Sequence, residues 1–142
     1  ANGPLLTVGQ VLLVRGMREI EAFGDNRSKK LMDYLTIYSD GKINVNKAPK
    51  EVLESLGENM DSALASAIVD YRKEEAFESL DDLRKVPGMH DEVLAEINPW
   101  ITVKSASFSI DVQVNCNGAV ASIKTVAQKQ ENKTRLIYWQ VL

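Results

Sequence analysis

The clearest hydrophobic pattern in the sequence lies near its C-terminal end, where apolar and polar residues alternate. From Ala106 onward every second residue is apolar, and the residues between them are Ser, Asp, Gln and Asn. A period of two is typical of a strand with one buried face. The apolar set is Phe108, Ile110, Val112, Val114 and Cys116. We therefore predict one long strand whose apolar face is buried and whose cysteine is a packed thiol.

Two further strands are predicted after this one. Asn117-Gly118 is a pair that favours a two-residue type I′ turn, so the chain should fold straight back. A polar turn then leads into a last strand that carries Tyr138 and Trp139. We expect a three-stranded antiparallel sheet over residues 105–142. Tyr138 and Trp139 should point to opposite faces, with at least one of them in the core.

The pattern before residue 105 is helical and contains a repeat. Residues 7–17 align without gaps on residues 79–89, and each segment shows apolar residues at helical spacing. Each segment begins with a hydroxyl residue that can cap a helix and ends at a glycine that can stop one. The capping pairs are Thr7 with Gln10 and Ser79 with Asp82, and the closing glycines are Gly16 and Gly88.

Similar strand-like segments follow the two copies, at residues 35–39 and 101–105. The repeat therefore predicts duplicated supersecondary units. Between the copies, Asn46 can cap a helix that has Pro49 in its first turn. Asp61 starts a stronger helix, and we predict that its polar end, residues 72–75, is exposed to solvent.

Taken together, the two periods predict an α+β fold. We expect a helical part over residues 1–104 with two repeated helix-turn units, and an antiparallel sheet over residues 105–142.

The charges divide along the same line. Residues 51–96 contain thirteen acidic residues against four basic ones, whereas residues 104–142 contain five Lys or Arg against Asp111 and Glu131. The formal net charge of the whole chain is -3. The helical part is therefore strongly acidic, which disfavours binding to phosphates.

Acid–base or nucleophilic catalysis would depend on His90 and Cys116, the only histidine and the only cysteine. His90 falls in a turn and Cys116 on a strand of another module, and the sequence suggests no third group to orient them. A single cysteine also rules out a thiolate zinc cluster.

Two carboxylate pairs could in principle act as acid and base. Asp81 with Asp82 and Asp91 with Glu92 both fall at predicted helix starts. The helix macrodipole stabilises negative charge there, which explains the pairs without catalysis. The glycines are isolated, so no phosphate loop of the P-loop or dinucleotide type occurs. We predict no enzyme activity, no catalytic residues and no cofactor.

Structural calcium is the one ligand that the sequence leaves open. Asp25-Asn26, and Ser39-Asp40 with Asn44, could supply oxygen ligands. The EF-hand spacing is absent. Asx and Ser residues in turns commonly bond to nearby backbone groups instead.

Nucleic-acid binding is the alternative function. Residues 43–48, residues 67–72 and residues 77–89 resemble the helix-hairpin-helix modules of competence DNA receptors, which hold phosphates with backbone amides at a hairpin with two closely spaced glycines. Here the hairpins at Gly16, Gly57 and Gly88 each lack the second glycine. The amide cradle and the DNA function are therefore expected to be lost.

A larger set of segments resembles one family in the same order along the chain. In chain order these are residues 2–4 and 12–17, residues 33–49, which include Ile43-Asn44-Val45-Asn46, residues 86–89, and the C-terminal part from residues 108–110 to residues 138–139. They are similar to the K-type minor pseudopilin of general secretion pathways, also called type II secretion systems. The resemblance covers essentially the whole chain.

This resemblance implies a pilin-like sheet that carries a helical, sterile-alpha-motif-like insertion. Family members are held in the inner membrane by an N-terminal hydrophobic helix. They cap the pseudopilus tip with the I and J pseudopilins on the periplasmic side. No stretch here approaches about 18 consecutive apolar residues, so we expect a soluble fragment without that helix. The partners implied are the I-type and J-type minor pseudopilins, and partner-binding residues are not assigned.

Overall fold

The computed structural model describes residues 3, 5–17, 31–131 and 133–141 of the chain. The chain forms two compact units, residues 1–39 and residues 40–142. This division differs from the predicted boundary after residue 104, which stays a prediction.

In the described residues of the first unit lie the short 3-10 helices η1 (Val8–Leu13) and η4 (Leu31–Tyr34), and neither has a buried residue. The strand-like segment at residues 35–39 forms no strand, so that prediction is wrong. The amide of Tyr38 instead donates to Thr36 Oγ1 at 3.1 Å. Such a local bond competes with the ladder of a sheet.

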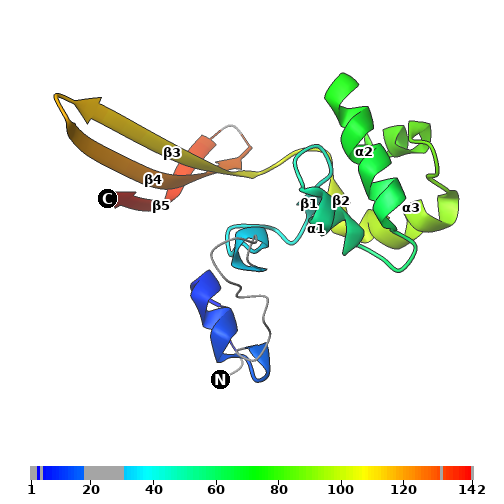
Figure 1. Cartoon of the computed structure of the whole chain (residues 1–142), viewed down its shortest axis with the longest axis horizontal. Coiled ribbons are helices and arrows are strands. Elements are labelled where there is room, and N and C mark those ends of the chain that lie inside the picture. The colour runs from blue at the N-terminus through cyan, green and yellow to red at the C-terminus, as the bar shows by residue number, and fades with distance from the viewer. Residues whose placement is uncertain (1–2, 4, 18–30, 132, 142) are drawn as a thin grey trace. The chain divides into compact units, whose positions relative to one another are not determined.

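The second unit begins with a helical module, residues 43–104 (Figure 1). Its two short strands, β1 (Ile43–Asn44) and β2 (Ile101–Thr102), pair in parallel and join its two ends. The helices between them are α1 (Lys50–Glu54), α2 (Ser62–Glu74), η5 (Leu80–Lys85), α3 (Asp91–Ile97) and η6 (Asn98–Trp100).

Helix α2 confirms the strongest helical prediction. Its N-cap is Asp61, whose Oδ1 accepts a hydrogen bond from the amide of Leu64 at 2.8 Å. Leu64, Ala65 and Ile68 are buried, as the helical spacing predicts.

The helical module has one continuous hydrophobic core. Leu53, Ile68, Leu83 and Ile97 are fully buried, each from a different helix. The buried cluster is Val45, Ala48, Leu53, Met60, Leu64, Ala65, Ile68, Phe77, Leu83, Val86, Val93, Leu94, Ile97 and Ile101. Burial of these side chains is the main stabilising contribution within this module.

The repeat is confirmed in the backbone of both units. In each copy the third, seventh and tenth residues after the cap donate to the carbonyl three residues back. In the first copy the bonds run from Gln10, Val14 and Met17; in the second they run from Asp82, Val86 and Met89. Gly16 and Gly88 have φ angles of 87° and 88°, the left-handed turn that glycine tolerates.

The polar side chains of the capping pairs also match. Gln10 Oε1 accepts the amide of Leu6, and Asp82 Oδ2 accepts the equivalent amide of Glu78. Asp82 Oδ2 also accepts the amide of Ser79. The two copies differ in burial, because Leu83 and Val86 lie in a core whereas η1 buries nothing.

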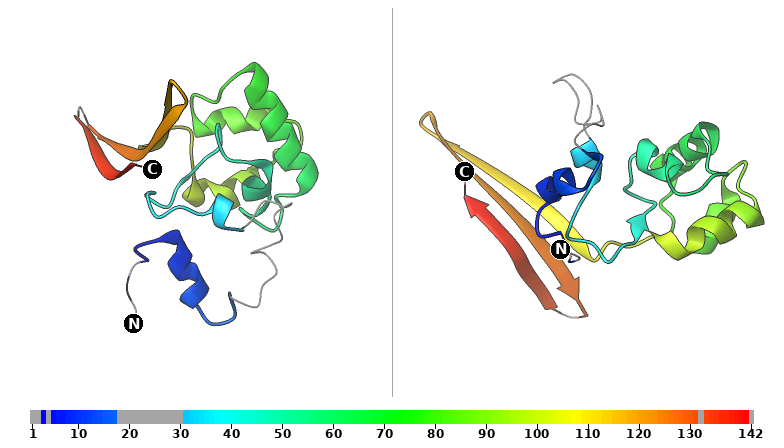
Figure 2. Two further views of the ribbon diagram at one scale, coloured as in Figure 1. Left: turned by 60° about the vertical axis from the view of Figure 1, so that its left-hand side comes forward. Right: turned by 90° about the horizontal axis from the view of Figure 1, so that it is seen from below.

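The C-terminal part is the predicted three-stranded antiparallel sheet, in the order β3 (Ser107–Cys116), β4 (Ala119–Gln130) and β5 (Lys133–Val141). Figure 2 shows its twist along the strands. Asn117 and Gly118 have φ angles of 50° and 88°. Positive φ at both residues confirms the predicted type I′ turn.

Burial of the sheet differs from the prediction. The apolar face of β3 is exposed, with Ile110 at 42% and Val114 at 54%. Cys116 is exposed, and neither Tyr138 at 37% nor Trp139 at 57% lies in a core. These predictions are wrong because alternation sets which residues share a face, whereas burial needs a second layer. Tyr138 pairs with Val126 and Trp139 with Thr125, which confirms their opposite faces.

Mixed helices and strands with this sheet confirm the α+β class. Among the described helices, none combines the length and apolar character needed to span a bilayer.

Candidate functional site

The turn before α2, which contains Gly57, Glu58 and Asn59, binds the carboxylate of Glu96. Glu96 Oε1 accepts the amide of Glu58 at 2.9 Å, and Glu96 Oε2 accepts Asn59 Nδ2 at 3.1 Å. These hydrogen bonds, led by the amide of Glu58, lower the pKa of the Glu96 carboxyl. A Cβ on Gly57 would lie 2.6 Å from this carboxylate. The absence of a side chain at Gly57 therefore lets Glu96 reach the turn.

Glu96 already accepts the hydrogen bonds that the amide of Glu58 and the side chain of Asn59 could otherwise donate to an anionic ligand. A phosphate held by these donors would compete with a tethered carboxylate that already satisfies them. The sequence predicted a lost cradle from the missing second glycine. The contact of Glu96 with this turn could not be read from the glycine pattern, because Glu96 lies in α3, far away in sequence.

We expect the Gly57 and Glu96 positions to be coupled in stability. Gly57→Ala should push the carboxylate off the turn, and Glu96→Ala should remove it, so each lowers the urea midpoint of unfolding. Because both changes break the same contact, the double variant should unfold at the midpoint of the worse single variant. Additive losses in chemical denaturation would contradict this coupling. Glu92→Ala, an exposed change in the same helix, is the control.

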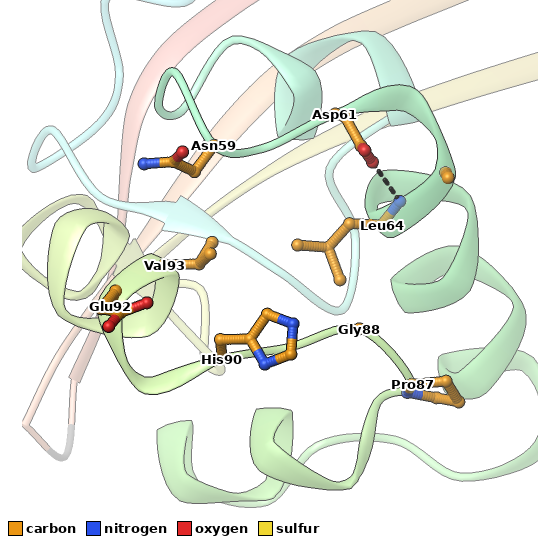
Figure 3. Close-up of a pocket in the computed structure, with 9 residues that line it drawn as sticks. Asn59, Asp61, Leu64, Pro87, Gly88, His90, Glu92 and Val93 are labelled. Carbon is orange, nitrogen blue, oxygen red and sulfur yellow. Dashed lines mark hydrogen bonds between the residues drawn. The ribbon is translucent and has the colours of Figure 1, made fainter.

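The second turn, around Gly88, borders an open pocket of about 480 Å³ (Figure 3). Asp61 and Glu92 line it together with His90. Asp61 caps α2 through its carboxylate. Two carboxylates beside the turn repel a phosphate, so the pocket opposes nucleic-acid binding at this position.

His90 and Cys116 do not form a dyad. His90 is exposed at the start of α3, and Cys116 is exposed at the end of β3. The carboxylate pairs Asp81 with Asp82 and Asp91 with Glu92 lie in the first turns of η5 and α3, as predicted.

Most basic side chains of residues 51–96 are paired with nearby carboxylates. Lys73 Nζ lies 2.7 Å from Asp70 Oδ1, and Lys85 Nζ lies 2.8 Å from Asp82 Oδ1. Arg84 pairs with Asp91. The pairing with Lys85 is the main cause of a strongly lowered pKa for the Asp82 carboxyl. Arg72 is the basic residue in this range that forms no ion pair with a described carboxylate.

Arg72 has a structural contact instead. Its Nη1 donates to the carbonyl of Val45 at 2.6 Å, and burial lowers its pKa. The polar end of α2 was predicted to be exposed to solvent, and this prediction is wrong for Arg72. Its guanidinium ties the end of α2 to the residue that follows β1.

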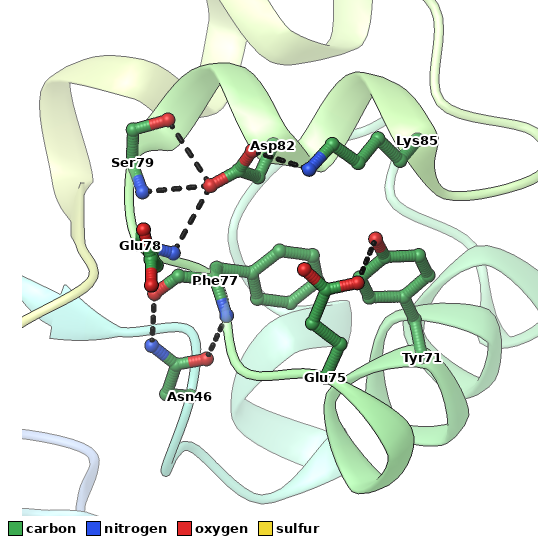
Figure 4. A network of polar contacts seen from close by, with 8 residues as sticks. All are labelled: Asn46, Tyr71, Glu75, Phe77, Glu78, Ser79, Asp82 and Lys85. Carbon is green, nitrogen blue, oxygen red and sulfur yellow. Dashed lines mark hydrogen bonds and ion pairs between the residues drawn. The ribbon is translucent and has the colours of Figure 1, made fainter.

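Asn46 joins three segments of the module, and Figure 4 shows its two hydrogen bonds to Phe77. Its Nδ2 donates to the carbonyls of Phe77 at 2.8 Å and Val103 at 3.1 Å, and its Oδ1 accepts the amide of Phe77 at 2.9 Å. Asn46 was predicted to cap a helix. That prediction is wrong, because α1 begins after Pro49 and its N-cap has no side-chain bond.

The oxygens proposed for calcium have other partners where the structure describes them. Asp40 Oδ1 accepts the amide of Lys42 at 3.0 Å, and Asn44 Oδ1 accepts the amide of Asn46 at 2.9 Å. Asp25-Asn26 lies outside the described residues. Within residues 3, 5–17, 31–131 and 133–141, no group of three or more His, Cys, Asp or Glu side chains could hold a metal ion.

The comparisons with known proteins give one match. Residues 43–104, the helical module, match the model of the family described as type II secretion system (T2SS), protein K. No curated protein and no solved structure matches the chain.

Proposed function

We propose that the chain is a minor pseudopilin that binds other minor pseudopilins, because its residues 43–104 match the family model of type II secretion system protein K. The family gives the chain a role in type II secretion. The finer role is to form and cap the tip of the pseudopilus with the I-type and J-type minor pseudopilins. The family match over the helical module is the observation that carries this proposal.

The exposed apolar face of the sheet supports a function by association. Phe108, Ile110 and Val112 of β3 are 48%, 42% and 44% exposed, and Trp139, two strands away on β5, is 57% exposed. Large contiguous apolar surface in a folded protein is typical of an interaction site.

Within this proposal the chain has no catalytic role. The family is a structural component of the secretion system. His90 and Cys116 lie in separate elements, and Asp61 and Asp82 have structural partners. We place the protein at the periplasmic face of the inner membrane. We also interpret residues 1–104 as a sterile-alpha-motif-like helical insertion carried on the sheet of residues 105–142.

DNA binding is the alternative that the helix-hairpin-helix resemblance raises. It is opposed by the tethered carboxylate of Glu96 at one turn and by Asp61 and Glu92 beside the other. Phosphate affinity depends mainly on Lys and Arg that are available to neutralise phosphates. Lys73, Arg84 and Lys85 are already paired with carboxylates.

Co-purification tests the proposal. The tagged full-length protein, expressed with the I-type and J-type pseudopilins of the same operon, should retain both after nuclease treatment and a high-salt wash. Retention of neither partner would overturn the proposal. Recovery of partners only before nuclease treatment would favour the nucleic-acid alternative.

A further inference from the structure

The second unit contains an open cleft of about 690 Å³ whose lining carries positive charge and no negative charge. Lys47, Arg72, Lys104 and Lys129 line it, and none of its lining residues is Asp or Glu. This is unusual for a module whose residues 51–96 contain thirteen acidic and four basic residues. We propose that this basic cleft binds an acidic polypeptide segment of a partner protein through the carboxylates of that segment.

The four cations are available for a ligand. In the part of the chain that the structure describes, no carboxylate forms an ion pair with Lys47, Arg72, Lys104 or Lys129. Elsewhere in the module, Lys50, Lys73, Arg84 and Lys85 all have a carboxylate partner. Within residues 43–104, the cations without a described carboxylate partner therefore all line the cleft, where they would raise the local concentration of anionic ligands.

The floor of the cleft is held in place by internal hydrogen bonds. Asn46 links the residues after β1 to Phe77 and Val103, and Asn44 Nδ2 donates to Ser105 Oγ at 2.7 Å. Arg72 is fixed by the carbonyl of Val45, and the guanidinium has further N–H donors for a carboxylate. A guanidinium held in this way loses less entropy when it binds a carboxylate than a mobile side chain does.

The cleft favours a peptide over a small anion. Its volume falls in the range of sites that hold ligands much larger than one phosphate. Phe108, 48% exposed, adds an apolar contact at the wall, and Ser107 and Ser109 add hydroxyl groups that can donate to carboxylates. A peptide segment uses all three kinds of group.

The surroundings favour a peptide over nucleic acid. Glu74 and Glu75, both exposed, directly precede the lining residue Ala76. A duplex carries a phosphate at every nucleotide and would bring several of them against this acidic surface. A short segment can place a few carboxylates in the cleft and leave the rest of the surface uncovered.

A peptide titration with the whole 142-residue chain tests the inference. The probe is a fluorescein-labelled hexaglutamate with an amidated C-terminus, followed by fluorescence anisotropy. We expect binding that weakens when salt is raised from about 50 mM to about 500 mM. The triple variant Lys47→Gln, Lys104→Gln and Lys129→Gln should weaken binding by at least about tenfold. Circular dichroism checks that each variant remains folded.

A second triple variant controls for net charge. This variant, Lys50→Gln, Lys124→Gln and Lys133→Gln, also removes three positive charges, but from positions that do not line the cleft. It should change the affinity for the peptide by less than about threefold. Equal losses in both triple variants, or no binding by the parent chain, would overturn the inference.

Competition separates the other anions. Millimolar inorganic phosphate that displaces the probe fully would identify a small-anion site. Duplex DNA that binds more tightly than the peptide, through the same three lysines, would identify a nucleic-acid site. Either result overturns the inference. The inference rests on the proposed function only for the identity of the partner protein that contains the acidic segment. Peptide binding can therefore fail while co-purification succeeds, and co-purification can fail while peptide binding succeeds.

Discussion

Replacing Asn46 with alanine is expected to lower the free energy of unfolding by about 2 to 4 kcal/mol. The change deletes three hydrogen bonds that join the residues after β1 to Phe77 and to Val103. It also leaves the amide of Phe77 and two carbonyls without these partners at a partly buried position. Each such group adds a desolvation cost to the lost bond.

Urea unfolding followed by far-UV circular dichroism measures this effect. Asn115→Ala is the control, because the Asn115 side chain is exposed and accepts a single bond from the amide of Gly118 at 3.3 Å. We expect the control to change stability by about 0.5 kcal/mol or less. A loss at Asn46 no larger than the loss at Asn115 would show that Asn46 does not hold the module together.

The two repeat copies provide a matched pair for the second large effect. Val86 and Val14 occupy equivalent positions, and each amide donates to the carbonyl three residues back at 3.0 Å. Val86 is 2% exposed, whereas Val14 is 50% exposed. Val86→Ala should therefore cost about 2 to 3 kcal/mol, from lost apolar burial and a residual cavity.

Val14→Ala removes the same atoms from the same local backbone. We expect it to cost less than about 1 kcal/mol, because half of the side chain already contacts solvent. Thermal unfolding of the two variants gives the comparison. Equal destabilisation would mean that the first copy has a core of its own.

The sequence predicted the features that depend on local chemistry. Asp61 starts α2, Asn117-Gly118 forms the type I′ turn, and the repeat ends at Gly16 and Gly88 in both copies. Each of these depends on backbone preferences or on a bond to a residue a few positions away. Local sequence therefore contains the necessary information.

Features that depend on distant contacts were not predictable in the same way. Glu96 binds a turn 37 and 38 residues away, and Asn46 binds residues 31 and 57 positions away. Asn46 has an equally good local use as a helix cap, and only the packed module decides between the two. The basic cleft likewise combines three lysines and one arginine from four separate segments.

Burial of the sheet was mispredicted for a related reason. The alternation at Ile110 and Val112 defines an apolar face, and the register with β4 confirms that face. Alternation does not specify what covers the face, and both residues are exposed among the described residues. Period-two patterns therefore predict faces more securely than they predict burial.

The most direct measurement of the central claim compares two titrations of the same chain at matched salt. One uses the purified periplasmic domains of the I-type and J-type pseudopilins, and the other uses duplex DNA. If the chain works by binding pseudopilins, we expect a saturable complex at micromolar or lower concentration with the protein pair and a much weaker interaction with DNA. Saturable DNA binding that decreases steeply with salt, together with no complex with the pseudopilins, would contradict the account.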